Sequence, residues 1–182
     1  MVLWFKTVHD YDFNFETATL AFFNKYPNPY ASHVESVDTV DRQVIDGKLH
    51  TTRLIRKRGK LPRWVKPFLG KISHSWIVEK TVLDPQTKEM TAYQRNLDHT
   101  RIIRVEEYTT FRYEEPENMT RVSYRVKFSS GFKGFGVKNR IEAWSHSRFQ
   151  ENIKNTRLGM AYVMQQCKEG QRKKAEQITG QL

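Results

Sequence analysis

The sequence predicts a single α+β domain, in which a curved antiparallel sheet of about six to seven strands is closed by one long C-terminal helix. Alternating segments separated by turn signals follow one another from residue 33 to residue 130. A long amphipathic pattern of helical period comes next, and no linker or internal repeat divides the chain. A sheet of this size closed by an amphipathic helix can enclose an apolar cavity.

The first predicted elements are a strand at residues 2–9 and a short helix. In the segment NFETATLAFFNKY (residues 14–26), Asn14 is a suitable N-cap. Apolar residues recur there at helical spacing, namely Phe15, Ala18, Phe22 and Tyr26. The segment YPNPY then ends the helix, because a residue that precedes proline is disfavoured in helical conformation.

From residue 33 the pattern changes to strands. The segments HVESVDTVDRQVI (33–45) and KLHTTRLIRK (48–57) flank Asp46-Gly47, a strong signal for a two-residue hairpin. Four more strands are expected at residues 74–83, 90–97, 101–113 and 121–130, separated by the turn-like segments DPQTKE, DHT and EEPEN. The last strand alternates most regularly, and its apolar face consists of Val122, Tyr124, Val126 and Phe128.

The long helix is predicted at about residues 137–168. Its apolar stripe has helical period and consists of Phe149, Ile153, Thr156, Met160, Val163 and Cys167. Residues 169–182 read as a polar, frayed tail, so the domain is expected to span residues 1–168.

The charge of the chain, +11 overall, is concentrated in two segments. Residues 51–75 hold eight cations and no acid, and residues 133–182 hold ten cations and four acids. Such segments indicate an anionic partner, which can be nucleic acid, a membrane surface or a phosphate-bearing ligand. No run approaches the roughly 18 apolar residues of a membrane span. The first twelve residues resemble neither a secretory signal nor an Arg-rich presequence.

The most basic stretch, RKRGKLPRWVKPFLG (residues 56–70), also carries large apolar side chains such as Trp64 and Phe68. Gly59 and Gly70 bracket it and two prolines interrupt it, so a single regular helix or strand is not expected there. A solvated surface needs no Trp64 or Phe68, and a core segment does not tolerate six charges.

The sequence shows no sign of an enzyme. It contains no nucleophile elbow, no P-loop and no dinucleotide fingerprint, and GFKGFG reads as a glycine-hinged turn. The single cysteine, Cys167, excludes an internal disulfide and a Cys-based metal site, and the six histidines lack metal-ligand spacing. Asp98-His99 lacks a nucleophile partner and reads as a polar turn. No metal or cofactor is expected.

Two pairs of residues are candidates for an internal anion site. Arg53 and Lys57 share one face of their strand, and cations fall on both of its faces, so one or more is expected to point inward. The alternative is that the long stems reach the rim of the sheet. On the long helix, Arg148 and Asn152 flank the apolar stripe one turn apart, and there the alternative is a solvated helix edge.

The segments FFNKYPNPYASHV, TTRLIRKRGKLPRWVKPFLG, NLDHT, RVKFSSGF and IEAWSHSRFQENIKNTRLGMAYV are typical of one family. Over about residues 1–168 the chain resembles the PRELI-like phospholipid transfer proteins of the mitochondrial intermembrane space, and most of all the fungal phosphatidic acid carriers. The resemblance implies a START-like curved sheet with a lipid tunnel, a mobile lid loop and a C-terminal helix over the cavity. It also implies a small helical-hairpin partner with twin Cys-x9-Cys motifs.

The resemblance further implies a basic site for the lipid headgroup. The matching positions are Lys25, His33, Arg53, Lys57, Lys60, Arg148 and Asn152. Lys25 stands where arginine is common in the family, and Arg148 stands where lysine is common, which keeps the charge but alters the geometry of the contacts. The implied lid and membrane contacts are Gly59, Leu61, Arg63, Trp64, Val65, Lys66 and Phe68.

Together these observations predict a carrier that moves phosphatidic acid between mitochondrial membranes without covalent chemistry. It is expected to work in the intermembrane space, to touch the anionic surface of the inner membrane transiently, and to form a heterodimer with its small partner. Another anionic lipid such as phosphatidylserine is the alternative cargo. A single-stranded nucleic-acid module and a lipid esterase or phosphatase are the rivals of other classes. We expect no nucleic-acid binding, because the aromatics follow core periodicities and no RNP-like motif is present.

Overall fold

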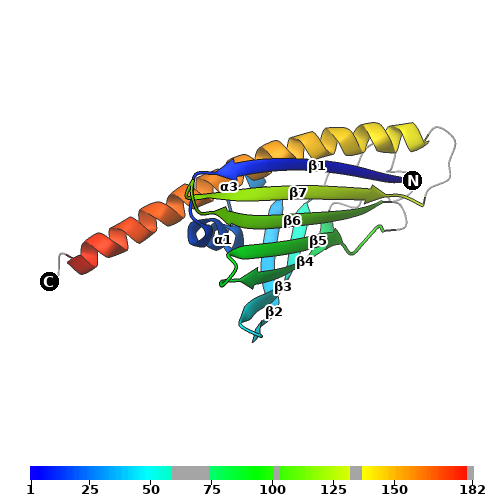
Figure 1. Cartoon of the computed structure of the whole chain (residues 1–182). Coiled ribbons are helices and arrows are strands. Elements are labelled where there is room, and N and C mark those ends of the chain that lie inside the picture. Colours follow the sequence, from blue (N-terminus) through cyan, green and yellow to red (C-terminus); the bar gives the residue numbers. More distant parts are fainter. Residues whose placement is uncertain (59–73, 101–102, 132–136, 180–182) are drawn as a thin grey trace.

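The computed structural model describes residues 1–58, 74–100, 103–131 and 137–179. Its centre is one seven-stranded antiparallel sheet with the order β1-β7-β6-β5-β4-β3-β2. The sheet bends so strongly that β2 and β3 run across the direction of β1 and β7 (Figure 1). The strands are β1 (Val2–Tyr11), β2 (Val34–Ile45), β3 (Lys48–Arg58), β4 (His74–Asp84), β5 (Glu89–Asn96), β6 (Arg104–Glu114) and β7 (Met119–Ser129). The predicted α+β class and its curved antiparallel sheet are confirmed.

Tight turns set the register of three of the hairpins, β2–β3, β4–β5 and β6–β7. Asp46 and Gly47 both have positive φ, 50° and 75°, which is the geometry of a two-residue hairpin whose twist matches the flanking strands. They bring Ile45 opposite Lys48 at the start of the β2–β3 ladder. The predicted hairpin is therefore confirmed. The β4–β5 and β6–β7 turns likewise lie at the predicted segments DPQTKE and EEPEN.

Strand β1 lies beside β7, although the two are far apart in the sequence. Their ladder runs from Val2 opposite Ser129 to Tyr11 opposite Thr120. This pairing makes the N-terminal strand one edge of the sheet and leaves β2 at the other edge. The sequence predicted a strand at this position but did not identify its partner.

Within the described part of the chain, two helices and a 3₁₀ turn cover the concave side of the sheet. They are α1 (Phe15–Phe23), η1 (Pro29–Ala31) and α3 (Val137–Thr179). Asn14 caps α1 as predicted, since its side chain accepts a hydrogen bond from the Thr17 amide at 2.9 Å. Helix α1 packs against α3 and β6, and Phe22 meets Phe111 of β6 edge to face with ring centroids 5.4 Å apart. These contacts belong to the main core, which also includes Met160, Val163 and Met164 of α3.

Helix α3 is longer than predicted. Of the predicted stripe, Phe149, Met160 and Val163 are buried, whereas Thr156 is exposed. The prediction that the helix ends at residue 168 was wrong, because it continues to Thr179 and projects away from the sheet (Figure 1). The segment beyond residue 168 is rich in Lys, Arg, Glu and Gln, which are good helix formers, so it needs little tertiary packing to stay helical. Within the described ranges, no helix is long and apolar enough to cross a membrane.

Candidate functional site

A cavity of about 300 Å³ lies between the concave face of the sheet and α3. Most of its wall is apolar and comes from β4, β6, β7 and α3. Representative wall residues are Ile77, Val105, Phe111, Phe128, Trp144 and Ile153. The predicted alternation of β7 explains part of this wall, because Val122, Tyr124 and Phe128 all face the cavity. Such a wall suits an apolar ligand.

One part of the cavity wall is basic. His33, Lys57, Arg148 and Asn152, which come from three different parts of the chain, all line it. Burial lowers the pKa of His33 below its usual value, and the nearby charges of Lys57 and Arg148 lower it further. His33 is therefore held neutral at neutral pH. The sequence predicted that these four residues share one site, and the structure brings them to the same wall.

Lys57 keeps its charge inside the cavity. Burial acts to lower the pKa of Lys57, but the surrounding Tyr26, Glu107 and Glu79 outweigh that effect, and the pKa lies above its usual value. Arg148 lines the cavity while also donating a hydrogen bond to Glu151 at 3.1 Å. This wall can therefore present two permanent positive charges to an anion.

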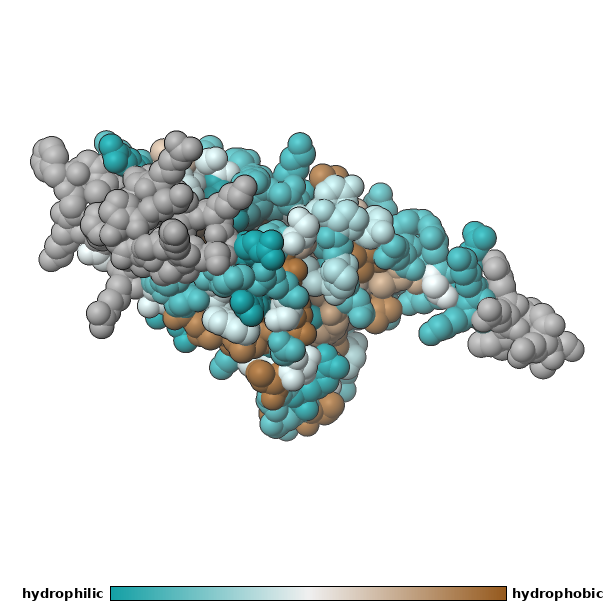
Figure 2. All heavy atoms as spheres, turned by 180° about the vertical axis from the view of Figure 1, so that it is seen from behind, coloured by the Kyte–Doolittle hydropathy of each residue, from teal (hydrophilic) through white to brown (hydrophobic). Residues whose placement is uncertain are grey.

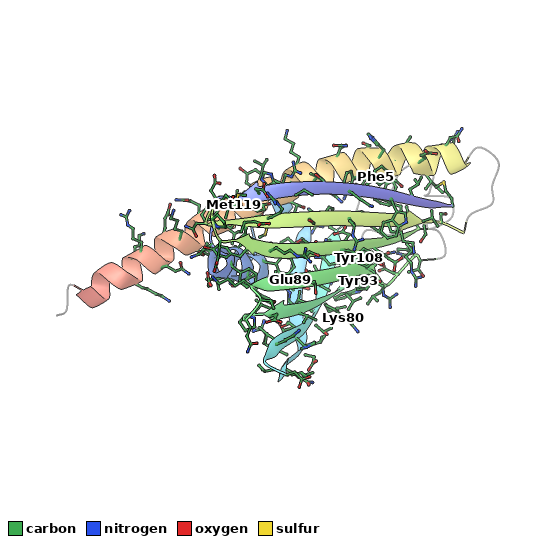
Figure 3. The ribbon with its side chains drawn as sticks, viewed as in Figure 1. Phe5, Lys80, Glu89, Tyr93, Tyr108 and Met119 are labelled. Atoms are coloured by element: carbon green, nitrogen blue, oxygen red, sulfur yellow. The ribbon has the colours of Figure 1, made fainter. Side chains whose placement is uncertain are left out.

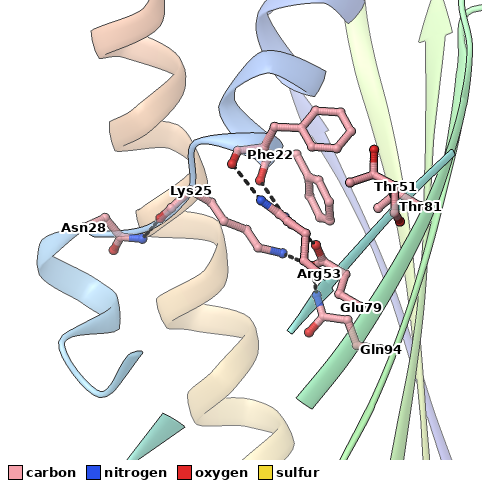
Figure 4. Close-up of polar contacts among 9 residues, drawn as sticks. Phe22, Lys25, Asn28, Thr51, Arg53, Glu79, Thr81 and Gln94 are labelled. Atoms are coloured by element: carbon pink, nitrogen blue, oxygen red, sulfur yellow. Dashed lines mark hydrogen bonds and ion pairs between the residues drawn. The ribbon is translucent and has the colours of Figure 1, made fainter. Parts of the chain in front are cut away.

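Two further cations, Lys25 at the cavity wall and Arg53 behind it, are already neutralised in part by Glu79 (Figure 4). Lys25 Nζ donates to Glu79 Oε2 at 2.6 Å, and Arg53 Nε donates to Glu79 Oε1 at 2.6 Å. The side-chain amide of Gln94 donates to Glu79 Oε2 at 2.5 Å. Burial acts to raise the pKa of Glu79, but the charges and hydrogen bonds of Lys25 and Arg53 outweigh it and lower the pKa below its usual range.

Arg53 points inward, as one alternative predicted, but its anionic partner is a side chain of the protein itself. Its guanidinium also donates to the carbonyl oxygens of Phe23 at 2.7 Å and Phe22 at 3.4 Å, which end α1. Arg53 is 3% exposed and does not line the cavity, whereas Lys25 and Gln94 do. Arg53 therefore ties α1 to β3 and β4. Sequence reasoning missed Glu79, although Ile77, Glu79 and Thr81 alternate with Val78 and Lys80 and so place a carboxylate on the inner face of β4.

One further polar residue of the wall, Glu107, was also missed. Glu107 faces the cavity and accepts a hydrogen bond from Tyr124. Burial and the nearby Glu107 together raise the pKa of Tyr124 well above its usual value.

In the segment NLDHT, Asp98 accepts hydrogen bonds from the Ser75 hydroxyl at 2.6 Å and from the Trp76 amide at 3.0 Å. Asp98 thus belongs to a structural turn, as predicted.

Several predicted residues lie outside the described part of the chain. They are Lys60 of the headgroup set and all of the lid residues, namely Gly59, Leu61, Arg63, Trp64, Val65, Lys66 and Phe68. The flanking residues Arg58 and His74 both line the cavity. Each of them also bonds Glu35 at 2.9 Å, so the last residue of β3 and the first residue of β4 are held together.

A curved antiparallel sheet that packs against one long helix and encloses a cavity between them is a START-like fold, as predicted. Solved structures agree in fold. A protein of Thermus thermophilus superposes with a TM-score of 0.58 at 16% identity, over 89% of this chain and 97% of that chain. A protein of unknown function from Staphylococcus aureus superposes with a TM-score of 0.59 at 10% identity, over 93% of this chain and 97% of that chain.

The chain belongs to the PRELI-like family, whose model matches residues 16–171. It is 50% identical to "Protein UPS1, mitochondrial" of Saccharomyces cerevisiae over 170 residues, which are 93% of this chain and 97% of that protein. It is 40% identical to "Protein ups1 homolog" of Schizosaccharomyces pombe over 84% of this chain and 90% of that protein. The human "PRELI domain-containing protein 1, mitochondrial" is 33% identical over 79% of this chain and 67% of that protein. The predicted resemblance is thereby confirmed.

Proposed function

We propose that this protein carries phospholipids between mitochondrial membranes, with phosphatidic acid as its main cargo, and that it performs no covalent chemistry. The observation that carries the proposal is an apolar cavity whose wall bears the cations Lys57 and Arg148 beside His33 and Asn152. A lipid has the same two parts, which are apolar chains and a charged headgroup. The names of the relatives from yeast and human contain the word mitochondrial, which supports a mitochondrial location. Within the mitochondrion we propose the intermembrane space.

The cost of exposing acyl chains explains why a carrier needs an enclosed cavity. Each methylene in water costs roughly 0.8 kcal/mol, so about 30 of them cost on the order of 25 kcal/mol. A flat surface cannot offset such a cost. A cavity walled by side chains such as Phe111, Phe128 and Trp144 offsets this cost for the methylenes that it encloses, because it replaces the bilayer interior with an equally apolar surrounding.

The basic wall suits a phosphate monoester. Such a group carries about 1.5 to 2 negative charges near pH 7 and three acceptor oxygens. Lys57 and Arg148 supply the matching positive charge, and Asn152 can add a neutral hydrogen-bond donor. Phosphatidylserine, the alternative cargo, carries its phosphate as a diester with a single charge and needs room for a larger headgroup.

The test is transfer between vesicles. Fluorescent phosphatidic acid should move from donor to acceptor vesicles when the protein is added, and fluorescent phosphatidylcholine should not. Equal transfer of the two lipids would refute the headgroup preference. Transfer of neither would refute the carrier function itself.

We also propose a small helical-hairpin partner with twin Cys-x9-Cys motifs, which stabilises the carrier by binding its folded state. Exposed apolar side chains on edge strand β2 support the need for a partner, because Val40, Val44 and Ile45 are 59%, 72% and 46% exposed. Figure 2 shows hydrophobic surface at the protruding lower end of the molecule, where the β2–β3 hairpin lies. A melting temperature that saturating partner leaves unchanged would contradict this proposal.

A further inference from the structure

Glu79 occupies an unusual position for an acid in a protein that is proposed to bind anions. It is 0% exposed and lies on β4, immediately behind the cavity wall. Lys25, Arg53 and Gln94 all donate to its carboxylate, and Figure 4 shows the three side chains converging on it. Two of these donors, Lys25 and Gln94, line the cavity and share the same carboxylate oxygen.

The two cations on Glu79 are held very differently. Arg53 has further acceptors in the carbonyl oxygens of Phe22 and Phe23, and it lies away from the cavity. Among the described residues, Glu79 is the one hydrogen-bond acceptor that Lys25 Nζ reaches, although the ammonium also lies 3.7 Å above the ring centre of Phe22. An ammonium group has three donors. Lys25 can therefore leave Glu79 and turn to a ligand in the cavity, whereas Arg53 cannot.

The exchange leaves no buried charge without a partner. When Lys25 turns away, Glu79 keeps the Arg53 guanidinium and the Gln94 amide, so the carboxylate stays neutralised and hydrogen-bonded. A phosphate in the cavity then replaces the Glu79 carboxylate as the hydrogen-bond acceptor of Lys25. Both anions are oxygen acceptors, and they compete for the same ammonium.

Resting on the proposed function, we propose that Glu79 is the internal competitor of the lipid headgroup. It holds Lys25 in the empty carrier, gives Lys25 up to the phosphate when a lipid enters, and takes it back when the lipid leaves. A carrier must release what it binds, and a binding site composed of cations alone would retain an anionic lipid. Glu79 is thus a positioning residue, which acts through Lys25 and sets the rate of lipid release.

The test compares Glu79→Gln with the wild-type protein. Each is loaded with fluorescent phosphatidic acid, and its release to acceptor phosphatidylcholine vesicles is followed by stopped-flow fluorescence. Loss of the unit charge that lies 2.6 Å from the Lys25 ammonium should slow lipid release roughly tenfold and raise the amount of lipid extracted from vesicles. A merely structural role would move both quantities the other way. Glu89→Gln is the matched control, because it changes the net charge equally at the surface ion pair of Glu89 and Arg112 (Glu89 is labelled in Figure 3).

Lys25→Met and the double variant test whether Glu79 acts through Lys25. Lys25→Met alone should release lipid faster than the wild type, and Glu79→Gln should add nothing in that background. Should Glu79→Gln fail to fold, Glu79→Asp keeps the negative charge on a side chain one methylene shorter, so its hold on Lys25 should weaken and release should also slow.

The proposal is overturned if the folded Glu79 variants release lipid as fast as the wild type. It is equally overturned if their effect persists without Lys25. A wild-type protein that takes up no anionic lipid would refute the proposed function, and this inference with it. Normal wild-type transfer beside unchanged Glu79 variants would refute the role of Glu79 alone.

Discussion

Replacing Arg53 by methionine should lower the free energy of unfolding by about 3 kcal/mol. The substitution removes the 2.6 Å hydrogen bond to Glu79 and the 2.7 Å hydrogen bond to the Phe23 carbonyl oxygen. Breaking one member out of a buried charge pair costs about 3–5 kcal/mol. The lower end of that range applies, because Lys25 and Gln94 remain on the carboxylate. Methionine also keeps the apolar stem.

Thermal unfolding followed by circular dichroism measures this loss. For a chain of this size about 3 kcal/mol corresponds to a fall in Tm of roughly 6–12 °C. Arg121→Met, at the exposed ion pair with Asp10, is the control and should change the Tm far less. An unchanged Tm with abolished lipid transfer would refute the reasoning, because Arg53 would then be a headgroup ligand rather than a part of the framework.

The remaining predictions concern the cavity wall and its support. Lys57→Gln should reduce transfer of phosphatidic acid at least severalfold with an unchanged Tm, because it removes a cation from the cavity wall. The control Lys154→Gln, on the exposed side of α3, should leave transfer unchanged. Equal transfer rates for the two variants would place the headgroup elsewhere. Gly159→Ala should lower stability in urea unfolding by about 1 kcal/mol, because a Cβ there would lie 2.9 Å from the side-chain oxygen of Asn28. Hydrogen bonds to the Lys25 carbonyl and the Tyr30 amide hold that side chain, so the clash should exceed the roughly 1 kcal/mol that alanine gains in a helix. A stabilised variant would show that the Asn28 side chain moves aside freely. Because the pKa of His33 is lowered in the folded state, the stability that a neutral His33 preserves is present above about pH 6.5 and is lost as the pH falls through the folded pKa. His33→Gln should flatten the Tm between about pH 7 and pH 5, and an unchanged slope would mean that another group titrates.

Most of the sheet could be predicted because its signals are local. The positive φ of Asp46 and Gly47 follows from residue type, and the face of Val126 and Phe128 follows from alternation. The pairing of β1 with β7 could not be predicted, because it joins residues more than a hundred positions apart and no turn fixes it. The end of α3 was mispredicted because the prediction followed the apolar stripe, which stops at Cys167. The helix continues to Thr179 as a polar, solvated segment that carries no such stripe.

The candidate site divides in the same way. Lys57, Arg148 and Asn152 could be placed by their faces and by the family resemblance, and all of them line the cavity. The role of Arg53 could not be predicted, because it depends on Glu79 lying directly opposite in the β3–β4 ladder. No tight turn sets that register, since fifteen residues separate Arg58 from His74.

The identity of the bound lipid tests the central claim most directly. The protein would be purified with its partner under native conditions, and the lipids that remain bound would be identified by mass spectrometry against the lipid composition of the source membranes. The account predicts strong enrichment of phosphatidic acid in the wild type and loss of that enrichment in Lys57→Gln. Bound lipid that matches the membrane composition in both proteins would contradict it.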